Sequence, residues 1–554
     1  MSYAGLPCLL LGLGLWGWIR WQAEPVLFER GASVPQHQLI QAYFNQNPHA
    51  SYRDPYRHHQ RRGDNLEQIL VDQIQSAQSQ VEVAVQELRS PLIAQALRER
   101  HQHGVKVRLV LENTYSRPYS RYSEAEVAAL DEHLRSRYVE NLALLDRNQD
   151  RRISAAEAHQ WDALAILQQA KVPWLDDTAD GSKGSGLVHH KFVVIDGQRV
   201  VVTSANFTLS DLHGDLHQAR SQGNANSLLV IQSPAVAQAF QAEFELLWGN
   251  PTQKSRFGVS KPHRAAQQFW VGNAQVWVKF SPDSATVPWE QTSNGLIHQQ
   301  LTQGKSRIDL ALFVFSEQSL ANTLATVHQQ GVKVRALIDR SFAFRPYSEG
   351  LDLLGVALPQ RTPQASPCQV EVDNRPWPRP IATVGTPKLQ TGDLLHHKFA
   401  VVDQTRVVMG SHNWSDAANR LNDETLVAIV HPTVAAHYQQ EFERLYTNAR
   451  LGLPPSIQSQ WQAFRQQCGF SPGKPTNASP EHQQFSRSQP SVTLINLNQA
   501  SQQELEQLPG IGPKTAQAIM TARQVQPFRD LADLDRVPGI GPKTLQQIRD
   551  RVRW

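Results

Sequence analysis

The sequence predicts an α/β protein with two related lobes, followed by a small all-α domain at the C-terminal end. Two observations lead to this prediction. Alternating strand and helix patterns occur twice along the chain, in the same order and with similar amino-acid sequences. After about residue 453 the amino-acid composition changes, and a stretch rich in Pro, Ser, Gln and Asn precedes a compact helical segment. At 554 residues the chain is long enough for several domains, since single cores rarely exceed about 300 residues.

The composition is that of a folded globular body, with 40% apolar and 19% charged residues. The net charge of +4 and the pI of 8.9 permit an anionic partner without demonstrating one. The three cysteines have no metal-ligand spacing, and a bridge between Cys368 and Cys468 stays open.

The first 24 residues read as a signal peptide or a membrane anchor. Residues 4–19 are apolar and uncharged, which is short for a membrane span of about 20 residues. Arg20 and Arg30 follow this stretch and leave the side of the membrane open. We therefore expect a membrane-anchored or a secreted or periplasmic protein, with a buried N-terminal element as the alternative reading.

Each copy of the repeat opens with an apolar strand, an amphipathic helix and a second apolar strand. The copies begin at Val81 and Ile308, and both continue through Gly-Val-Lys-Val-Arg to Arg-Pro-Tyr-Ser. A strand, a helix and a parallel strand in this order form the crossover unit of an α/β sheet. We expect a first lobe over residues 25–258 and a second lobe over residues 259–453, related by a pseudo-twofold axis.

Each copy also carries His-x-Lys, four apolar residues and Asp. The two sets are His189, Lys191 and Asp196, and His396, Lys398 and Asp403. On a strand, residues two apart point to the same face, so each His should project together with its Lys. The next strand in each copy ends in a Ser-x-Asn element, namely Ser204-Ala205-Asn206 and Ser411-His412-Asn413.

These side chains suit the cleavage of a phosphodiester. Two imidazoles with pKa values of about 6.5 can divide the work at neutral pH, one as a neutral nucleophile and one as a protonated acid. Lys supplies positive charge to the phosphoryl oxygens, and Ser and Asn supply hydrogen bonds. We expect no cofactor or metal in catalysis. A solvated surface cluster is the alternative for one copy, and the matched second copy disfavours it.

The motifs closely resemble the H-x-K-x-x-x-x-D and G-S-x-N signatures of the phospholipase D superfamily over roughly residues 60–445. The resemblance implies two pseudo-twofold-related phospholipase D-like lobes of mixed sheets flanked by helices. It also implies that the motif histidines face each other across one active site. By analogy, His189 forms a phosphohistidine, while His396 protonates the leaving oxygen and then activates water. The order could be reversed.

The same resemblance assigns roles to the remaining catalytic candidates. The phosphate would be bound by Lys191, Lys398, Asn206 and Asn413 with Ser411 beside them. Asp196 and Asp403 would orient the site. Copy one has Thr203 where the family usually has Gly. Glu424 fits a family Glu that orients a histidine, but the equivalent stretch of copy one offers Asn226, so we expect an asymmetric site.

An insertion over residues 126–170 distinguishes the first copy. Its segment DRNQDRRISAAE, residues 146–157, matches the spacing of an EF-hand loop, although Arg151 stands where Gly usually makes the turn. We expect a structural Ca²⁺ site, with a charged helix-loop-helix without an ion as the alternative. The ligand positions would be Asp146, Asn148, Asp150, Arg152, Ser154 and Glu157.

The C-terminal segment, residues 491–554, follows an expected flexible linker over residues 454–490. It contains LPGIGPKTAQAI and, further on, VPGIGPKTLQQI. The glycines allow a tight turn between helices whose N–H groups can point at a phosphate. The segment resembles tandem helix-hairpin-helix modules, in particular those of bacterial competence-type DNA receptors, and such modules hold the DNA backbone. Protein contacts are the alternative. The DNA-binding candidates are Gly510, Gly512, Lys514, Thr515, Gly539, Gly541, Lys543 and Thr544.

Three functions follow from these features. The first is a phosphodiesterase that hydrolyses DNA held by the C-terminal module. The second is a phospholipase D at a membrane, which hydrolyses phosphatidylcholine-type lipids or transfers the phosphatidyl group. The third is a DNA-tethering protein without activity, which the intact motifs disfavour. The sequence leaves the substrate and the oligomeric state open.

Overall fold

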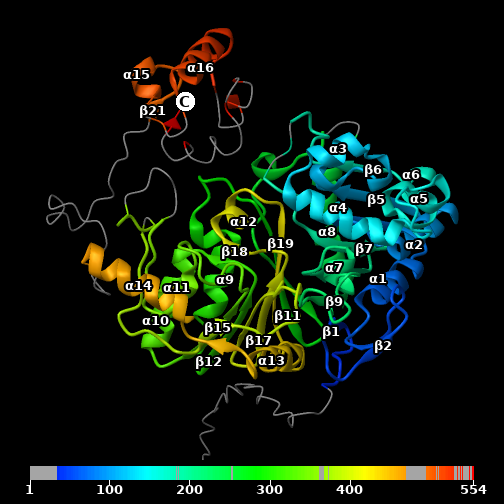
Figure 1. Cartoon of the computed structure of the whole chain (residues 1–554), viewed down its shortest axis with the longest axis horizontal. Coiled ribbons are helices and arrows are strands. Elements are labelled where there is room, and N and C mark those ends of the chain that lie inside the picture. The colour runs from blue at the N-terminus through cyan, green and yellow to red at the C-terminus, as the bar shows by residue number, and fades with distance from the viewer. Residues whose placement is uncertain are drawn as a thin grey trace, which may run out of the picture.

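The computed structural model describes residues 34–250 except 183 and 185, residues 254–469 except 361–366 and 372, and parts of residues 495–553 (Figure 1). The described chain forms the predicted mixed α/β body, in which the first lobe, blue through cyan to green in Figure 1, lies beside the green and yellow second lobe. The described part of the C-terminal segment contains helices and one short strand pair. The α/β fold class is therefore confirmed.

The first lobe is built on a seven-stranded mixed sheet in the order β1-β9-β8-β7-β4-β5-β6. Strands β4 and β5 are parallel and are joined by helix α2, which is the predicted crossover unit. The strands are β1 (Ile40–Phe44), β4 (Gln80–Val85), β5 (Lys106–Leu111), β6 (Trp174–Asp176), β7 (Lys191–Ile195), β8 (Arg199–Thr203) and β9 (Ser227–Gln232), with a separate β2 (Ser51–Arg53) and β3 (Gln60–Arg62) hairpin. The helices are α1 (Leu66–Gln75), α2 (Pro91–Gln102), α3 (Glu124–Ala129), α4 (Glu132–Leu145), α5 (Ala155–Trp161), α6 (Ala163–Gln169), α7 (Leu209–Leu212) and α8 (Pro234–Trp248).

The second lobe repeats this plan on a nine-stranded sheet in the order β10-β11-β19-β17-β16-β12-β14-β15-β20. Its parallel pair β12 and β14 is joined by α10. The strands are β10 (Gln267–Val271), β11 (Ala274–Ser281), β12 (Arg307–Leu312), β14 (Lys333–Ile338), β15 (Val384–Thr386), β16 (Lys398–Val402), β17 (Arg406–Gly410), β19 (Glu424–Val430) and β20 (Arg450–Leu451), with a separate β13 (Phe315–Ser316) and β18 (Trp414–Ser415) pair. The helices are α9 (Ser293–Leu301), α10 (Gln318–Gln329), α11 (Glu349–Leu353), α12 (Asp416–Arg420), α13 (Pro432–Tyr446) and α14 (Pro455–Cys468).

One apolar cluster joins the two lobes. It contains side chains of both central strands, such as Phe192 and Phe399, and of the long helices α8 and α13, such as Phe240 and Phe442. Strands β7 and β16 are buried along their whole length because each carries an unbroken apolar run. The motif strands are therefore held in the middle of a shared core.

The expected linker begins later than the sequence suggests. Residues 455–468 form helix α14, which packs Trp461 and Phe464 against the second lobe. A disulfide between Cys368 and Cys468 ties its end to that lobe. The prediction of a flexible linker from residue 454 is therefore wrong for this helix, while the remaining linker residues, 470–490, lie outside the described residues.

The membrane prediction is also corrected. No helix within the described ranges is long and apolar enough to cross a membrane, so the expected membrane anchoring is not supported. Residues 1–24, on which the prediction rested, lie outside the described residues.

The described part of the C-terminal segment contains α15 (Gln502–Leu505), α16 (Pro513–Val525) and the parallel pair β21 (Ile495–Asn496) and β22 (Val552–Arg553). Its buried apolar side chains, among them Leu497, Ile519 and Phe528, form a cluster of their own. This separate core agrees with an independent small domain.

Candidate active site

The motif histidines are held by main-chain contacts between the two lobes. His189 precedes β7, and its N–H donates to the Asp423 carbonyl at 2.9 Å. His396 precedes β16, and its N–H donates to the Ala225 carbonyl at 3.1 Å. Each histidine is thus anchored on a loop of the opposite lobe, in a pseudo-symmetric pair of contacts that brings both motifs to one place.

The Nδ1 atom of His189 lies 2.7 Å from a carboxylate oxygen of Glu424, the first residue of β19. Ser411 donates to the same oxygen at 2.7 Å. Glu424 is fully buried, and burial raises its pKa. A partner on Nδ1 fixes the ring and directs Nε2 away from the carboxylate.

The Nδ1 atom of His396 has a different partner. It lies 3.0 Å from the side-chain oxygen of Asn226, which precedes β9, and Ser204 donates to that oxygen at 2.8 Å. The site is therefore asymmetric, because one histidine contacts a carboxylate and the other an uncharged amide. The sequence predicted this asymmetry, but it did not predict that each partner comes from the other lobe.

The motif lysines are buried in the same place. Lys191 donates to the His189 carbonyl at 2.9 Å, and Lys398 donates to the His396 carbonyl at 2.9 Å. Burial lowers the pKa of Lys191 to about 8. Burial and the charge of Lys191 hold the pKa of Lys398 well below its ordinary range.

The histidines are affected in the same direction. Burial and the two lysine charges hold the pKa values of both His189 and His396 well below the ordinary value. The neutral imidazole is therefore favoured until negative charge enters the site. Two ammonium groups beside two imidazoles also form a concentrated cationic centre, which is suited to an anionic phosphoryl group.

The Ser-x-Asn elements end at the same site. Within the part of the chain that the structure describes, the side-chain oxygens of Asn206 and Asn413 are buried without a hydrogen-bond partner. Polar atoms of this kind are uncommon in folded proteins and are suited to a ligand.

The motif aspartates lie elsewhere. Asp196 and Asp403 follow the far ends of β7 and β16, at turns where both residues have positive φ. Asp196 accepts main-chain N–H groups of Gln78, Ser79 and Gln80 at 2.7–3.1 Å, and Asp403 accepts the equivalent groups of residues 305–307. Their grouping with the catalytic residues is corrected by this placement, because they fix the preceding turn and do not reach the histidines.

Two residues near the lysines escaped the sequence reasoning. Gln86 accepts from Lys191 at 3.3 Å, and the Phe313 ring lies 4.9 Å from the Lys398 ammonium and 4.9 Å from the His396 ring. They occupy the same position of the repeat, directly after β4 and β12. A position-by-position comparison of the two copies would have found them.

One group of three candidate metal ligands occurs among the described residues, namely His190, Glu243 and Asp423. The Lys261 ammonium contacts both carboxylates, and its nitrogen lies 2.5 Å from an Asp423 oxygen. Because an ammonium already supplies the positive charge there, the group is a buried ionic link between the lobes.

The EF-hand-like segment forms a helix-loop-helix between α4 and α5. Arg151 adopts φ of 66°, the left-handed conformation for which glycine is usual at this position. The carboxylate of Glu157 accepts main-chain N–H groups of Arg147 and Asn148 and caps α5 through Ser154. The residues after the loop form two helices, α5 and α6, because Asp162 caps a new helix. Calcium binding stays a prediction.

The DNA-binding candidates are described only in part. Gly512 precedes α16, and Thr515 lies in its first turn together with the backbone of Lys514. Gly510, Gly539, Gly541, Lys543 and Thr544 lie outside the described residues.

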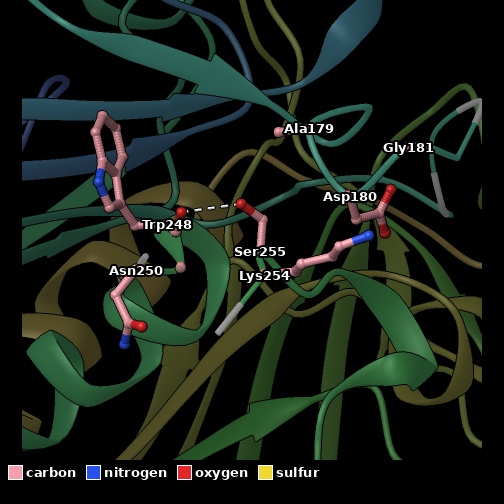
Figure 2. A pocket seen from close by; sticks show the side chains of 8 residues that line it. Ala179, Asp180, Gly181, Trp248, Asn250, Lys254 and Ser255 are labelled. Atoms are coloured by element: carbon pink, nitrogen blue, oxygen red, sulfur yellow. Dashed lines mark hydrogen bonds between the residues drawn. The ribbon is translucent and has the colours of Figure 1, made fainter. Parts of the chain in front are cut away.

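A pocket of about 530 Å³ lies at the C-terminal end of α8, away from the motif residues (Figure 2). Trp248, Lys254 and Asp180 line it, and Ser255 donates to the Trp248 carbonyl at 2.9 Å. Its lining contains no histidine, so it is not the site that the motifs form.

Comparison with known proteins identifies the family. The family described as "Cardiolipin synthase, PLD-like domain" matches residues 70–248 and 297–446. The helix-hairpin-helix motif matches residues 491–553. The chain therefore belongs to the phospholipase D superfamily and carries a C-terminal helix-hairpin-helix motif. The curated relatives that it matches include hydrolases.

Among curated relatives, the mitochondrial cardiolipin hydrolase of Xenopus laevis is 29% identical over 29% of this chain and 65% of its own length. The same protein of Xenopus tropicalis is 32% identical over 26% of this chain and 57% of its own length. The chain thus spans less than two thirds of these relatives. A solved phosphatidylserine synthase of Haemophilus influenzae is 11% identical with a TM-score of 0.43, over 78% of this chain and 94% of its own.

Proposed function

We propose that this protein is a phosphodiesterase that works through a phosphohistidine intermediate and hydrolyses phosphodiester bonds in DNA. The observation that carries the proposal is the pair of buried motif histidines, each held at Nδ1 by a side chain of the opposite lobe. Both rings thereby keep Nε2 for the substrate, and each motif lysine contacts the main chain of its motif histidine.

The geometry supports His189 as the nucleophile. Its Nε2 would attack phosphorus and form a P–N bond, which leaves a positive imidazole that the Glu424 carboxylate stabilises at 2.7 Å. The bond to the leaving oxygen breaks as His396 donates its proton to that oxygen. His396 has an amide partner, which holds a proton less firmly than a carboxylate does.

The second half of the reaction returns the site to its starting state. The neutral His396 would take a proton from water as the water oxygen attacks phosphorus, and the P–N bond to His189 breaks. Lys191 and Lys398 would balance the charge on the phosphoryl oxygens throughout.

The C-terminal motif supports DNA as the substrate. Helix-hairpin-helix turns present main-chain N–H groups to a phosphate, and Gly512 and Thr515 lie at such a helix start. A module joined to the catalytic lobes by a linker raises the local concentration of a bound strand. Binding of this kind is independent of base sequence.

A second candidate is the hydrolysis of an anionic phospholipid. The relatives that are cardiolipin hydrolases favour it, since the same histidine chemistry would cleave a lipid diester. The two substrates differ in the group that the protein must recognise, and the catalytic residues are common to both.

The test offers the full chain DNA and cardiolipin-containing vesicles in parallel, in EDTA. His189→Ala and His396→Ala should abolish DNA cleavage, and His159→Ala, which removes an exposed histidine, should preserve it. Alkaline quenching and mass spectrometry should find the phosphoryl group on His189. Lipid cleavage with intact DNA would replace the proposal by the second candidate. Loss of all activity in EDTA would refute the two-histidine mechanism.

A further inference from the structure

The two halves of the site place their carboxylates differently. Glu424 contacts His189 directly, and the equivalent position of the first lobe is the uncharged Asn226. Helix α7 of the first lobe carries Asp211 at the third position after its capping residue, and α12 of the second lobe carries Ala418 there. Each lobe therefore contributes one carboxylate to the site, from two non-equivalent positions.

Asp211 lies behind Asn226 and beside His396. One carboxylate oxygen is 3.7 Å from Nδ1 of His396 and accepts from the amides of Asn226 at 3.3 Å and Asn224 at 2.6 Å. The other oxygen accepts the main-chain N–H of Asn206 at 2.8 Å. Asp211 is 3% exposed, so its orientation is fixed by these bonds and its charge is poorly screened.

The surroundings of His396 otherwise favour the loss of its proton. The cationic or ionisable groups that act on it are His397 and Lys398, which follow it directly in the chain, and Lys191 and His189 of the first lobe. The Phe313 ring covers one side of it. Glu424 is engaged by His189, and Asp339 accepts the main-chain N–H of Leu395 at 2.8 Å. Asp211 is the carboxylate that stands beside the ring.

We propose that Asp211 is a positioning residue for this reaction. Directly and through the Asn226 amide, it supplies His396 with the negative charge that Glu424 supplies to His189. When an anionic phosphoryl group enters the site, this charge favours a proton on His396 that can pass from Nε2 to the leaving oxygen. The inference rests on the proposed phosphodiesterase function and assigns His396 its role as the acid.

The test measures the proton on His396 directly. NMR of the full chain labelled at the histidine ring carbons, with His396→Gln to assign the signal, gives the titration midpoint. Removing an opposite charge this close moves a midpoint by about one to three pKa units. We expect Asp211→Asn to lower the His396 midpoint by at least about one unit. The double variant Asn226→Asp with Asp211→Asn should restore it, because the charge is moved and not lost.

Asp416→Asn is the matched control, because it removes an exposed carboxylate from the equivalent helix α12 and should leave the midpoint unchanged. Kinetics with a small aryl phosphodiester give a second readout. Asp211→Asn should lower kcat at least about tenfold with KM little changed, and the basic limb of the kcat profile should move to lower pH. The double variant should recover both.

The outcomes separate the two proposals. An unchanged His396 midpoint in Asp211→Asn, or a His396 that does not titrate above pH 4 in the wild-type protein, would overturn the role of Asp211. A lowered midpoint that the double variant fails to restore would also overturn this role, because the shift would then come from local misfolding and not from the lost charge. A wild-type protein that shows the expected midpoints but cleaves neither DNA nor the aryl diester would instead overturn the proposed function.

Discussion

Replacement of Glu424 by Gln tests the charge that supports His189. Gln keeps the size of the side chain and an acceptor oxygen for Nδ1 of His189 at 2.7 Å, but it removes the buried negative charge. A hydrogen bond to a charged group contributes about 1.5–3 kcal/mol, against about 1 kcal/mol for a neutral one. Since a neutral bond remains, the lost charge should raise the barrier by about 0.5–2 kcal/mol if the charged bond strengthens as the phosphohistidine forms. Because about 1.4 kcal/mol is a factor of ten, kcat should fall about 2- to 30-fold.

The assay is single-turnover cleavage of a small aryl phosphodiester, with kcat and KM measured separately. KM should change little, because Lys191 and Lys398 bind the phosphate and remain in place. The control is Glu67→Gln, which alters another buried His–Glu pair, with 2.9 Å between His213 Nε2 and a Glu67 oxygen. The control should lose stability and keep its kcat per folded molecule. A Glu424→Gln protein with kcat within about twofold of wild type would refute this reasoning.

Four further predictions follow. The pKa of Lys191 is lowered to about 8 by burial, so kcat/KM should fall as pH rises through about 8 and Lys191 loses its charge, which a pH series would measure. Asp196→Ala frees three main-chain N–H groups and should reduce the free energy of unfolding by about 1–3 kcal/mol in urea titrations, with kcat per folded molecule nearly unchanged. If the EF-hand-like loop binds Ca²⁺, the ion at a hundred times its Kd should stabilise the protein by about 2.7 kcal/mol in thermal melts. Glu157→Gln should abolish this stabilisation, and removal of the ion by EDTA should leave the catalytic activity intact. Removal of residues 491–554 should weaken DNA binding and leave the cleavage of the small diester intact. The slope of log K against log salt concentration should change by about 0.9 for each phosphate that the protein no longer neutralises, and an unchanged slope would exclude the module from DNA binding.

The repeat made the two lobes and both motif strands predictable from the sequence. The similar sequences of the two copies predicted the order of strands and helices. The two-residue spacing of the His-x-Lys motif predicted that each His lies beside its Lys. The contacts between lobes could not be predicted, because Glu424 and His189 are 235 residues apart and meet only through the packing of two sheets. Periodicity within one copy carries no information on which lobe supplies a partner.

Two further features, helix α14 and the role of Asp211, also have a signal in the sequence. The many Gln and Ser residues of 455–468 favour a linker, yet Ile457, Trp461 and Phe464 recur at helical spacing and pack on the second lobe. Asp211 was overlooked because it belongs to no recognised signature. Its significance depends on Asn226, whose missing charge the sequence did show.

The union of both lobes in one chain explains why the site can be asymmetric. In a symmetric dimer of identical lobes, each histidine would meet the same partner from the other copy, so both would contact a carboxylate or both an amide. A single chain removes this constraint. Glu424 and Asn226 differ, and so do Gln86 and Phe313 beside the two lysines. A reaction that needs one nucleophile and one acid gains from such a difference, because the carboxylate favours the charged intermediate on one ring while the amide lets the other ring release its proton.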